Sequence, residues 1–261
     1  MADFETLLYT LDSGVATITM NRQDVYNALN DAMKKELNEA FKVCEKDASV
    51  RCVVLRGSGE KAFCSGQDLK EHRGKNRSLK ESLDESYNPL IRKMRSIEKP
   101  VIGQINGVAA GAGLSIALAC DMRLMAEHAK LIEVFVRIAL IPDSGSNWFL
   151  PRLVGLTRAF EYAALGDDIT AEEALRVGLV NAVHTKEELE TRTLELARRF
   201  ATAPTKTIGF IKRTLNRSLS SNLDDLLDYE ATIQEIASQT EDHAEGVKAF
   251  LEKRKAEFRG K

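Results

Sequence analysis

The stretch Asn106-Gly107-Val108-Ala109-Ala110-Gly111-Ala112-Gly113 stands between two apolar segments of different character. The run Val101–Ile105 before it is rich in β-branched residues and typical of a buried strand, whereas the run from Gly111 to Cys120 is typical of a helix. Small residues at a helix start let a ligand approach the backbone, and the free N–H groups and the helix dipole favour negative charge there. The stretch therefore predicts a strand-to-helix turn that binds an anionic group.

A second turn of this kind, Ala62-Phe63-Cys64-Ser65-Gly66-Gln67-Asp68-Leu69, comes earlier in the chain. Two such turns facing each other would supply two N–H donors to one developing oxyanion, and each donor is worth about 3 kcal/mol. A purely structural role for either turn stays open, because Gly-rich strand-to-helix turns are common. Dinucleotide or phosphate-loop binding is disfavoured, because no Tyr-x-x-x-Lys pair occurs and no Gly-Lys-Ser/Thr follows the 106–113 stretch.

Two further side chains are candidates for chemistry. Cys64 is disfavoured as a nucleophile, because no histidine lies near it in the sequence to activate the thiol. Asp143, in Ile141-Pro142-Asp143-Ser144-Gly145-Ser146, is flanked on both sides by apolar residues. Such surroundings raise the pKa of an acid and suit it to carrying a proton, but an aspartate before a helix also serves as an N-cap. The sequence alone leaves both roles open.

Strands and helices alternate over the first part of the chain, which predicts an α/β fold with parallel strands. An Asp-Ser-Gly turn joins the first two strands as a hairpin, and Asn30 or the neighbouring Asp31 caps the first helix. From about Leu156 onward the pattern is helical, so we expect a core over residues 1–200 and a helical region over 201–261. The apolar faces of that region predict packing on another subunit. The expected strands are Leu7–Leu11, Val15–Met20, Cys52–Leu55, Val101–Ile105 and Met122–Met125, and the expected helices include 31–46, 79–96, 111–120, 186–201, 205–218, 222–238 and 241–258.

Composition excludes several classes of protein. Among 261 residues, 44% are hydrophobic and 29% are charged, with a net charge of −2, so we expect neither a nucleic-acid surface nor a membrane patch. No apolar run approaches the roughly 20 residues that span a bilayer, and the N-terminus does not look like a signal peptide. Four cysteines and four histidines are scattered without metal-binding spacing. We therefore expect a cytoplasmic protein with free thiols and no metal site.

Taken together, these segments resemble the crotonase, or enoyl-CoA hydratase/isomerase, superfamily over nearly the whole chain. The resemblance implies a spiral of ββα units with a C-terminal helical trimerisation region, assembled as a trimer or a pair of trimers. It implies an acyl-CoA thioester as substrate, with no tightly bound cofactor. The matching segments are Met20-Asn21-Arg22, Tyr26-Asn27-Ala28-Leu29, and residues 62–69, 106–121, 141–152 and 245–254.

The resemblance also implies roles for individual residues. The two Gly-rich turns become an oxyanion hole for the thioester carbonyl, with the backbone N–H groups of Ser65 and Ala112 as donors, to within one residue. The Ala28 region and the 62–69 stretch become the binding site of the coenzyme A nucleotide. The residues that this assigns to coenzyme A are Ala28, Ala62, Cys64, Ser65, Gln67, Asp68 and Leu69.

Hydratases of this superfamily carry two glutamates, and the corresponding positions here hold Ser115 and Phe135. Because adding water needs one group to activate it and another to handle the α-proton, the chain is expected to be a poor hydratase. Glu133 lies two residues from the second position and is the carboxylate that a hydratase would use in place of the missing glutamate. Asp143 instead stands where many family isomerases carry their acid.

The segments around Asp143 resemble the 1,2-epoxyphenylacetyl-CoA isomerases of bacterial phenylacetate breakdown, although Ser146-Asn147 replaces the usual Gly-Thr. The expected activity is an acyl-CoA isomerase in which Asp143 moves a proton across an enolate, either shifting a double bond or isomerising a ring epoxide. An enoyl-CoA hydratase using Glu133 or Asp143 and a thioester hydrolase of the same fold are the alternatives. A non-catalytic RNA-associated or scaffold member is disfavoured by the near-neutral charge.

Overall fold

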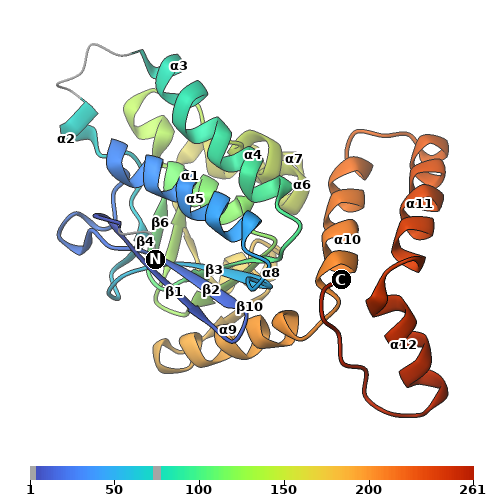
Figure 1. Ribbon diagram of the computed structural model, residues 1–261. Helices are drawn as coiled ribbons and strands as arrows, with labels where there is room; N and C mark the ends of the chain where they lie inside the picture. Colours follow the sequence, from blue (N-terminus) through green and yellow to red (C-terminus); the bar gives the residue numbers. More distant parts are fainter. Residues whose placement is uncertain (1–3, 73–77) are drawn as a thin grey trace.

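The computed structural model describes residues 4–72 and 78–261, and its largest sheet has six strands (Figure 1). The first two strands form the predicted hairpin, whose turn places Ser13 and Gly14 at φ 50° and 81°, as a two-residue hairpin turn requires. Every other pair of neighbours in this sheet is parallel, which confirms the α/β class. The strands, in spatial order, are β1 (Leu7–Asp12), β2 (Val15–Met20), β3 (Cys52–Gly57), β5 (Val101–Ile105), β7 (Met122–Ala126) and β10 (Ala182–His184).

A second, four-stranded sheet is built from strands of three residues each, which the sequence patterns did not predict. Three times, the chain leaves a strand of the large sheet, adds a short strand to this one and then enters a helix. That repeat produces a spiral of ββα units. Its strands, in spatial order, are β4 (Ala62–Cys64), β6 (Val108–Ala110), β8 (Lys130–Ile132) and β9 (Asp168–Thr170).

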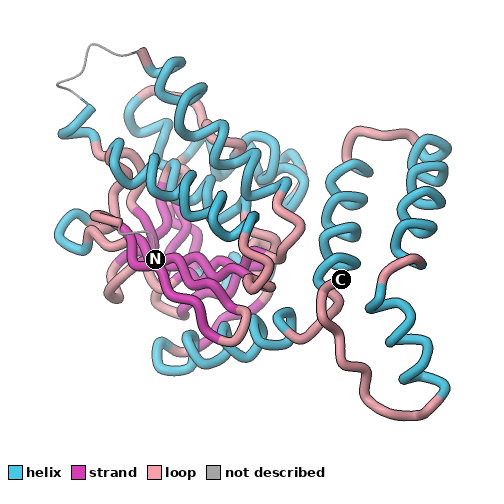
Figure 2. The backbone as a smooth tube through the Cα atoms, viewed as in Figure 1, coloured by secondary structure: helices cyan, strands magenta, loops and turns pink. Residues whose placement is uncertain are grey.

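Helices cover both faces of the large sheet (Figures 1 and 2). The side chain of Asn30 caps α1 (Asp31–Lys46) by accepting the Met33 N–H at 2.9 Å, so Asn30 rather than Asp31 is the cap. On this face α1 packs beside α4 (Asn88–Ser96), while α9 (Lys186–Ala201) contacts β3, β5 and β7 from the opposite face. The remaining helices of the core are α2 (Leu69–His72), α3 (Leu79–Ser82), α5 (Ala112–Ala119), α6 (Ser146–Val154), α7 (Leu156–Leu165) and α8 (Ala171–Arg176).

The helix predicted over residues 79–96 forms as one rod with an irregular middle. Its first turn, α3, is closed by a capping box between Ser78 and Glu81. A π-helical turn over Leu83–Tyr87 then leads directly into α4. A π turn inserts one extra residue and rotates the helix face beyond it, and such turns are frequent at functional sites.

The C-terminal helices α10 (Thr205–Ser218), α11 (Leu223–Ser238) and α12 (Glu241–Leu251) lie to one side of the core (Figure 1). The predicted division at residue 200 falls at the end of α9, just before this region. Buried Lys212 ties α10 to the core, with its Nζ 2.7 Å from the carbonyl oxygen of Met94 and 2.8 Å from Asp121 Oδ2. The region is therefore helical, as predicted, and anchored to the core by α10.

The helix predicted to continue to Phe258 ends at Leu251 instead, so that boundary was wrong. Lys253 adopts a left-handed conformation (φ 54°), and the Arg254 N–H closes the helix end by donating to the Ala249 carbonyl at 3.0 Å. The Arg254 guanidinium then binds both carboxylate oxygens of Glu245, at 2.6 and 2.8 Å. These contacts turn the last residues back along α12.

Candidate active site

The two glycine-containing turns lie against each other in the structure. A side-chain carbon added to Gly113 would come within 2.2 Å of the Cys64 carbonyl oxygen, so only glycine lets the start of α5 approach β4 this closely. Gly66, at φ +96°, faces the other turn, and a carbon added there would lie 2.9 Å from the Ala110 oxygen and 3.5 Å from the Ala112 nitrogen. The predicted pairing of the two turns is confirmed at the level of the backbone.

The backbone N–H groups of the first turn are not equally available. The Ser65 N–H donates to the Tyr26 carbonyl at 3.0 Å. Leu29 pairs with the segment on either side of Gln67, because its N–H binds the Gly66 oxygen at 2.8 Å and its oxygen accepts from Asp68 at 3.1 Å. Among the residues that the structure describes, the Gln67 N–H donates to no acceptor.

At the second turn the N–H groups of Ala112, Gly113 and Leu114 have no acceptor among the described residues, and that of Ala112 lies beside Gly66 of the first turn. Ala112 is the first residue of α5, so its donor has no partner inside the helix, and within residues 4–72 and 78–261 no other acceptor meets it. The candidate donor pair is thus Gln67 with Ala112, the open donor of α5 that lies beside the first turn. The resemblance implied Ser65, two residues before Gln67; the bridge to Leu29, which leaves the Gln67 N–H without an acceptor, depends on a distant segment and is not visible in a local pattern.

Asp143 lies in the turn before α6, and its backbone is held by two serines. Its carbonyl accepts the Ser146 N–H at 3.0 Å and the hydroxyl of Ser115, on α5, at 2.9 Å. Its carboxylate accepts the Ser144 hydroxyl at 2.8 Å. The N-cap of α6 is Gly145, and no side chain caps that helix, so the capping role considered for Asp143 is wrong.

The Asp143 carboxyl has the raised pKa that the sequence predicted. Desolvation raises the pKa of Asp143, and the hydrogen bond from Ser144 partly offsets this. The residue nevertheless keeps partial solvent exposure. It is therefore an acid that is reachable from outside and is more basic than an ordinary aspartate.

Glu133 is a second carboxyl group in this part of the core, but its side chain is 0% exposed. The Ser146 hydroxyl donates to its Oε1, whereas its Oε2 has no hydrogen-bond partner among the described residues. Burial, with the nearby charge of Asp143, raises the pKa of Glu133 to about 7. Solvent cannot reach this carboxyl group, which distinguishes it from Asp143.

The segments assigned to coenzyme A lie side by side through the bridge between Leu29 and Gln67. Arg22 crosses between them, with Nη1 2.7 Å from the Ala28 oxygen and 3.0 Å from Asp68 Oδ2. Three of the assigned side chains are buried and can meet a ligand only through their backbone, whereas Leu69 is 51% exposed and Ser65, Gln67 and Asp68 are half-buried. The buried three are Ala28, Ala62 and Cys64.

The Cys64 thiol lies under α5 and is 0% exposed. Burial raises the pKa of Cys64 to about 12, so the thiolate that a nucleophile needs does not form at neutral pH. Within the described part of the chain, no group of three or more His, Cys, Asp or Glu residues could hold a metal ion. No described helix is long and apolar enough to cross a membrane.

Comparisons with known proteins agree on one family. The model of a family described as enoyl-CoA hydratase/isomerase matches residues 10–261. A 1,2-epoxyphenylacetyl-CoA isomerase of Escherichia coli is 41% identical over 261 residues, with 98% of this chain and 99% of that protein covered. The chain belongs to the enoyl-CoA hydratase/isomerase family. It is therefore an enzyme, and the non-catalytic alternative loses its support.

Other members of the enoyl-CoA hydratase/isomerase family include proteins named as hydratases. A probable enoyl-CoA hydratase of Rhodobacter capsulatus is 40% identical over 258 residues, covering 99% of both proteins. The crystal structure of an enoyl-CoA hydratase from Bacillus anthracis matches this fold with a TM-score of 0.94 at 33% identity, over 98% of this chain and 100% of that one. The likeness confirms the predicted ββα spiral with its C-terminal helical region. The names of the relatives include both isomerases and hydratases.

Proposed function

We propose that the chain is an acyl-CoA isomerase that works through an enolate, with Asp143 as its acid–base group. The observation that carries this is the contrast between the two carboxyl groups of the site. Asp143 is reachable and has a raised pKa, whereas Glu133 is 0% exposed and is bonded to Ser146. One reachable carboxylate suits a proton transfer that returns the proton elsewhere on the substrate.

The two positions at which family hydratases carry glutamates support the same choice. Ser115 places its hydroxyl on the backbone of Asp143 rather than toward a substrate. Phe135 is apolar and 6% exposed. Hydration requires activation of water as well as handling of the α-proton, and neither of these side chains is an acid or a base at neutral pH.

In the proposed reaction the thioester oxygen accepts the N–H groups of Gln67 and Ala112. This moves the first donor from Ser65, whose N–H is already bonded to Tyr26. Negative charge that develops on that oxygen is stabilised by the donors and by the N-terminal end of α5. Asp143 then removes a proton and returns it two carbons away, so base and acid are one group.

The substrate proposed is an enoyl-CoA or an epoxide of the phenylacetyl-CoA type, since a relative with 41% identity is named 1,2-epoxyphenylacetyl-CoA isomerase. Coenzyme A would enter along Ala28 and residues 62–69 as part of the substrate. The proton transfer and the oxyanion donors all come from the chain, so this reaction needs no tightly bound cofactor. Hydratase activity is the alternative, because a relative with 40% identity is named a probable enoyl-CoA hydratase.

Two absorbance assays on the purified enzyme test the proposal. We expect a 3-enoyl-CoA to be converted to the conjugated 2-enoyl thioester. We expect a 2-enoyl-CoA to lose its absorbance to hydration at least about 100-fold more slowly, because Ser115 and Phe135 replace the glutamates that activate water in hydratases. Thiol release is followed in parallel to detect hydrolysis. Efficient loss of the 2-enoyl thioester to water, or rapid thiol release, would contradict the isomerase assignment.

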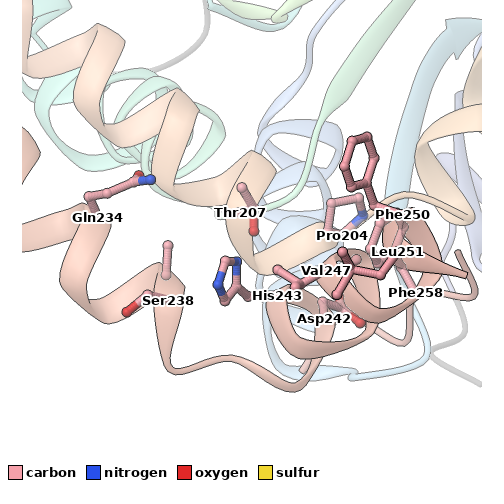
Figure 3. A pocket seen from close by; sticks show the side chains of 12 residues that line it. Pro204, Thr207, Gln234, Ser238, Asp242, His243, Val247, Phe250, Leu251 and Phe258 are labelled. Carbon is pink, nitrogen blue, oxygen red and sulfur yellow. The ribbon is translucent and has the colours of Figure 1, made fainter.

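We also propose that the C-terminal region packs on further copies of the chain, as a trimer or a pair of trimers. Large apolar side chains are exposed there, including Phe250 at 82%, Leu251 at 73% and Leu223 at 69%. A groove of about 410 Å³ lies between helices α10, α11 and α12, and the side chains of Val247, Phe250 and Leu251 that line it lie close together (Figure 3). Such surface is rarely left to solvent.

Light scattering tests this assembly. We expect a solution mass of three or six times that of the chain, and a lower mass for Phe250→Asp at the same protein concentration, because a charge would be buried at the interface. Leu8→Asp is the control, since Leu8 is 52% exposed on strand β1 of the core. A monomeric wild-type protein, or an unchanged mass for Phe250→Asp, would count against the assembly.

A further inference from the structure

The side chain of Gln67 is held at both of its polar atoms. Its Oε1 accepts the Tyr87 hydroxyl at 2.6 Å and the Lys34 ammonium at 3.2 Å. Its Nε2 donates to the Asp68 carbonyl at 3.2 Å. The Gln67 side chain thus sits in a cage contributed by α1, by the π turn and by its own loop.

Lys34 is an unusual member of this cage, because its side chain is only 2% exposed. Burying an ammonium costs several kcal/mol unless it is paired, and an apolar residue at this site of α1 would avoid that cost. The ammonium is paired with Asp31 Oδ1 at 2.8 Å and lies 5.1 Å from the ring centre of Tyr87. The structure therefore buries this cation beside the site together with the partners that offset the cost of burying it.

Tyr87 is the other residue that holds the Gln67 side-chain oxygen. It is 4% exposed and ends the π turn, which rotates the helix face that carries it. Burial, with the nearby carboxylates of Asp143 and Asp31, raises its pKa well above the usual value. The phenol therefore stays protonated and donates to Gln67 Oε1 throughout the working pH range.

The backbone around Gln67 explains what the cage adds. The Gln67 N–H, which donates to no described residue, belongs to the same planar peptide unit as the Gly66 carbonyl, and that carbonyl accepts the Leu29 N–H at 2.8 Å. This one bond leaves the unit free to rotate about it, and the far end of the unit is the Cα of Gln67, which carries the side chain. Anchoring the side chain at three points restrains that rotation.

We propose that Lys34 and Tyr87 are positioning residues, which through the Gln67 side chain aim the Gln67 N–H at the substrate's thioester oxygen. This deepens the proposed function and rests on its oxyanion hole. Preorganised donors stabilise a developing charge because they need not reorient during the reaction, and a misplacement of about 1 Å costs up to about 100-fold.

The test separates donor geometry from proton transfer. The thioester 4-dimethylaminocinnamoyl-CoA absorbs at longer wavelength when its carbonyl is polarised, so its shift on binding reports the oxyanion hole without turnover. We expect a clear red shift with the wild-type enzyme and a smaller one with Tyr87→Phe and Lys34→Met. In the isomerase assay these variants should lose about tenfold in kcat with KM changed less than about threefold.

Matched controls are Tyr162→Phe and Lys35→Met. Tyr162 is also a buried tyrosine, whose hydroxyl donates to Glu173 at 2.7 Å, and Lys35 is the exposed neighbour of Lys34. Because Lys34 and Tyr87 share one acceptor atom, their double variant should lose little more than the worse single variant.

Three outcomes decide the proposal. A reduced red shift in both variants, with full shifts in both controls, supports it even if the reaction proves to be hydration. Full red shifts in Tyr87→Phe and Lys34→Met overturn it while leaving the oxyanion hole intact. No red shift with the wild-type enzyme overturns both the positioning role and the proposed oxyanion hole.

Discussion

Asp143→Asn should lower isomerase turnover by about 1000-fold, within the range for loss of a general acid–base group. The amide has nearly the shape of the carboxylate, but it cannot take up and return a proton. The fold of the turn should persist, because Ser115 and Ser146 bind the backbone carbonyl of Asp143 rather than its side chain. The measurement is kcat and KM for a 3-enoyl-CoA, and we expect the loss to fall on kcat.

The control is Glu133→Gln, the same carboxyl-to-amide change at the other acid of the site. Because Glu133 is 0% exposed and faces Ser146, we expect this variant to keep turnover within about threefold of the wild-type value. The opposite pattern, with Asp143→Asn active and Glu133→Gln inactive, would transfer the acid–base role to Glu133. It would also make the hydratase alternative the better description.

Local patterns in the sequence predicted much of this fold. The hairpin follows from its Ser13-Gly14 turn, and α1 follows from the Asn30 cap and the spacing of its apolar residues. The raised pKa of Asp143 was also predicted, but its cause is burial in the fold rather than the apolar neighbours in the sequence, since Ile141 is 77% exposed. For the hairpin and the helix cap, the cause lies within a few residues of the effect.

Features that depend on distant segments were not predictable in this way. The three-residue strands of the second sheet are too short for a periodic pattern and exist only through pairing with each other. The shift of the donor from Ser65 to Gln67 depends on Leu29 and Tyr26, which come from another part of the chain. The end of α12 likewise depends on Arg254 reaching back to Glu245.

The second large effect is on how the free energy of unfolding depends on pH, and we expect Glu133→Gln to change it. An unfolded glutamate has a pKa near 4.5, whereas burial raises that of folded Glu133 to about 7. Between these values the folded protein holds the proton more tightly than the unfolded chain does. This group's contribution to the free energy of unfolding therefore falls as pH rises from about 4.5 to 7, by about 3 kcal/mol.

The glutamine variant has no proton to lose at this position, and its Oε1 can still accept the Ser146 hydroxyl. We therefore expect Glu133→Gln to gain stability relative to the wild type between pH 5 and pH 8, by up to about 3 kcal/mol. Urea unfolding at both pH values and one protein concentration measures this, with Glu187→Gln, on the exposed start of α9, as the control. The same pH dependence in wild type and variant would mean that Glu133 is ionised in the fold. Its orphaned Oε2 would then have to be satisfied by a bound water rather than by a proton.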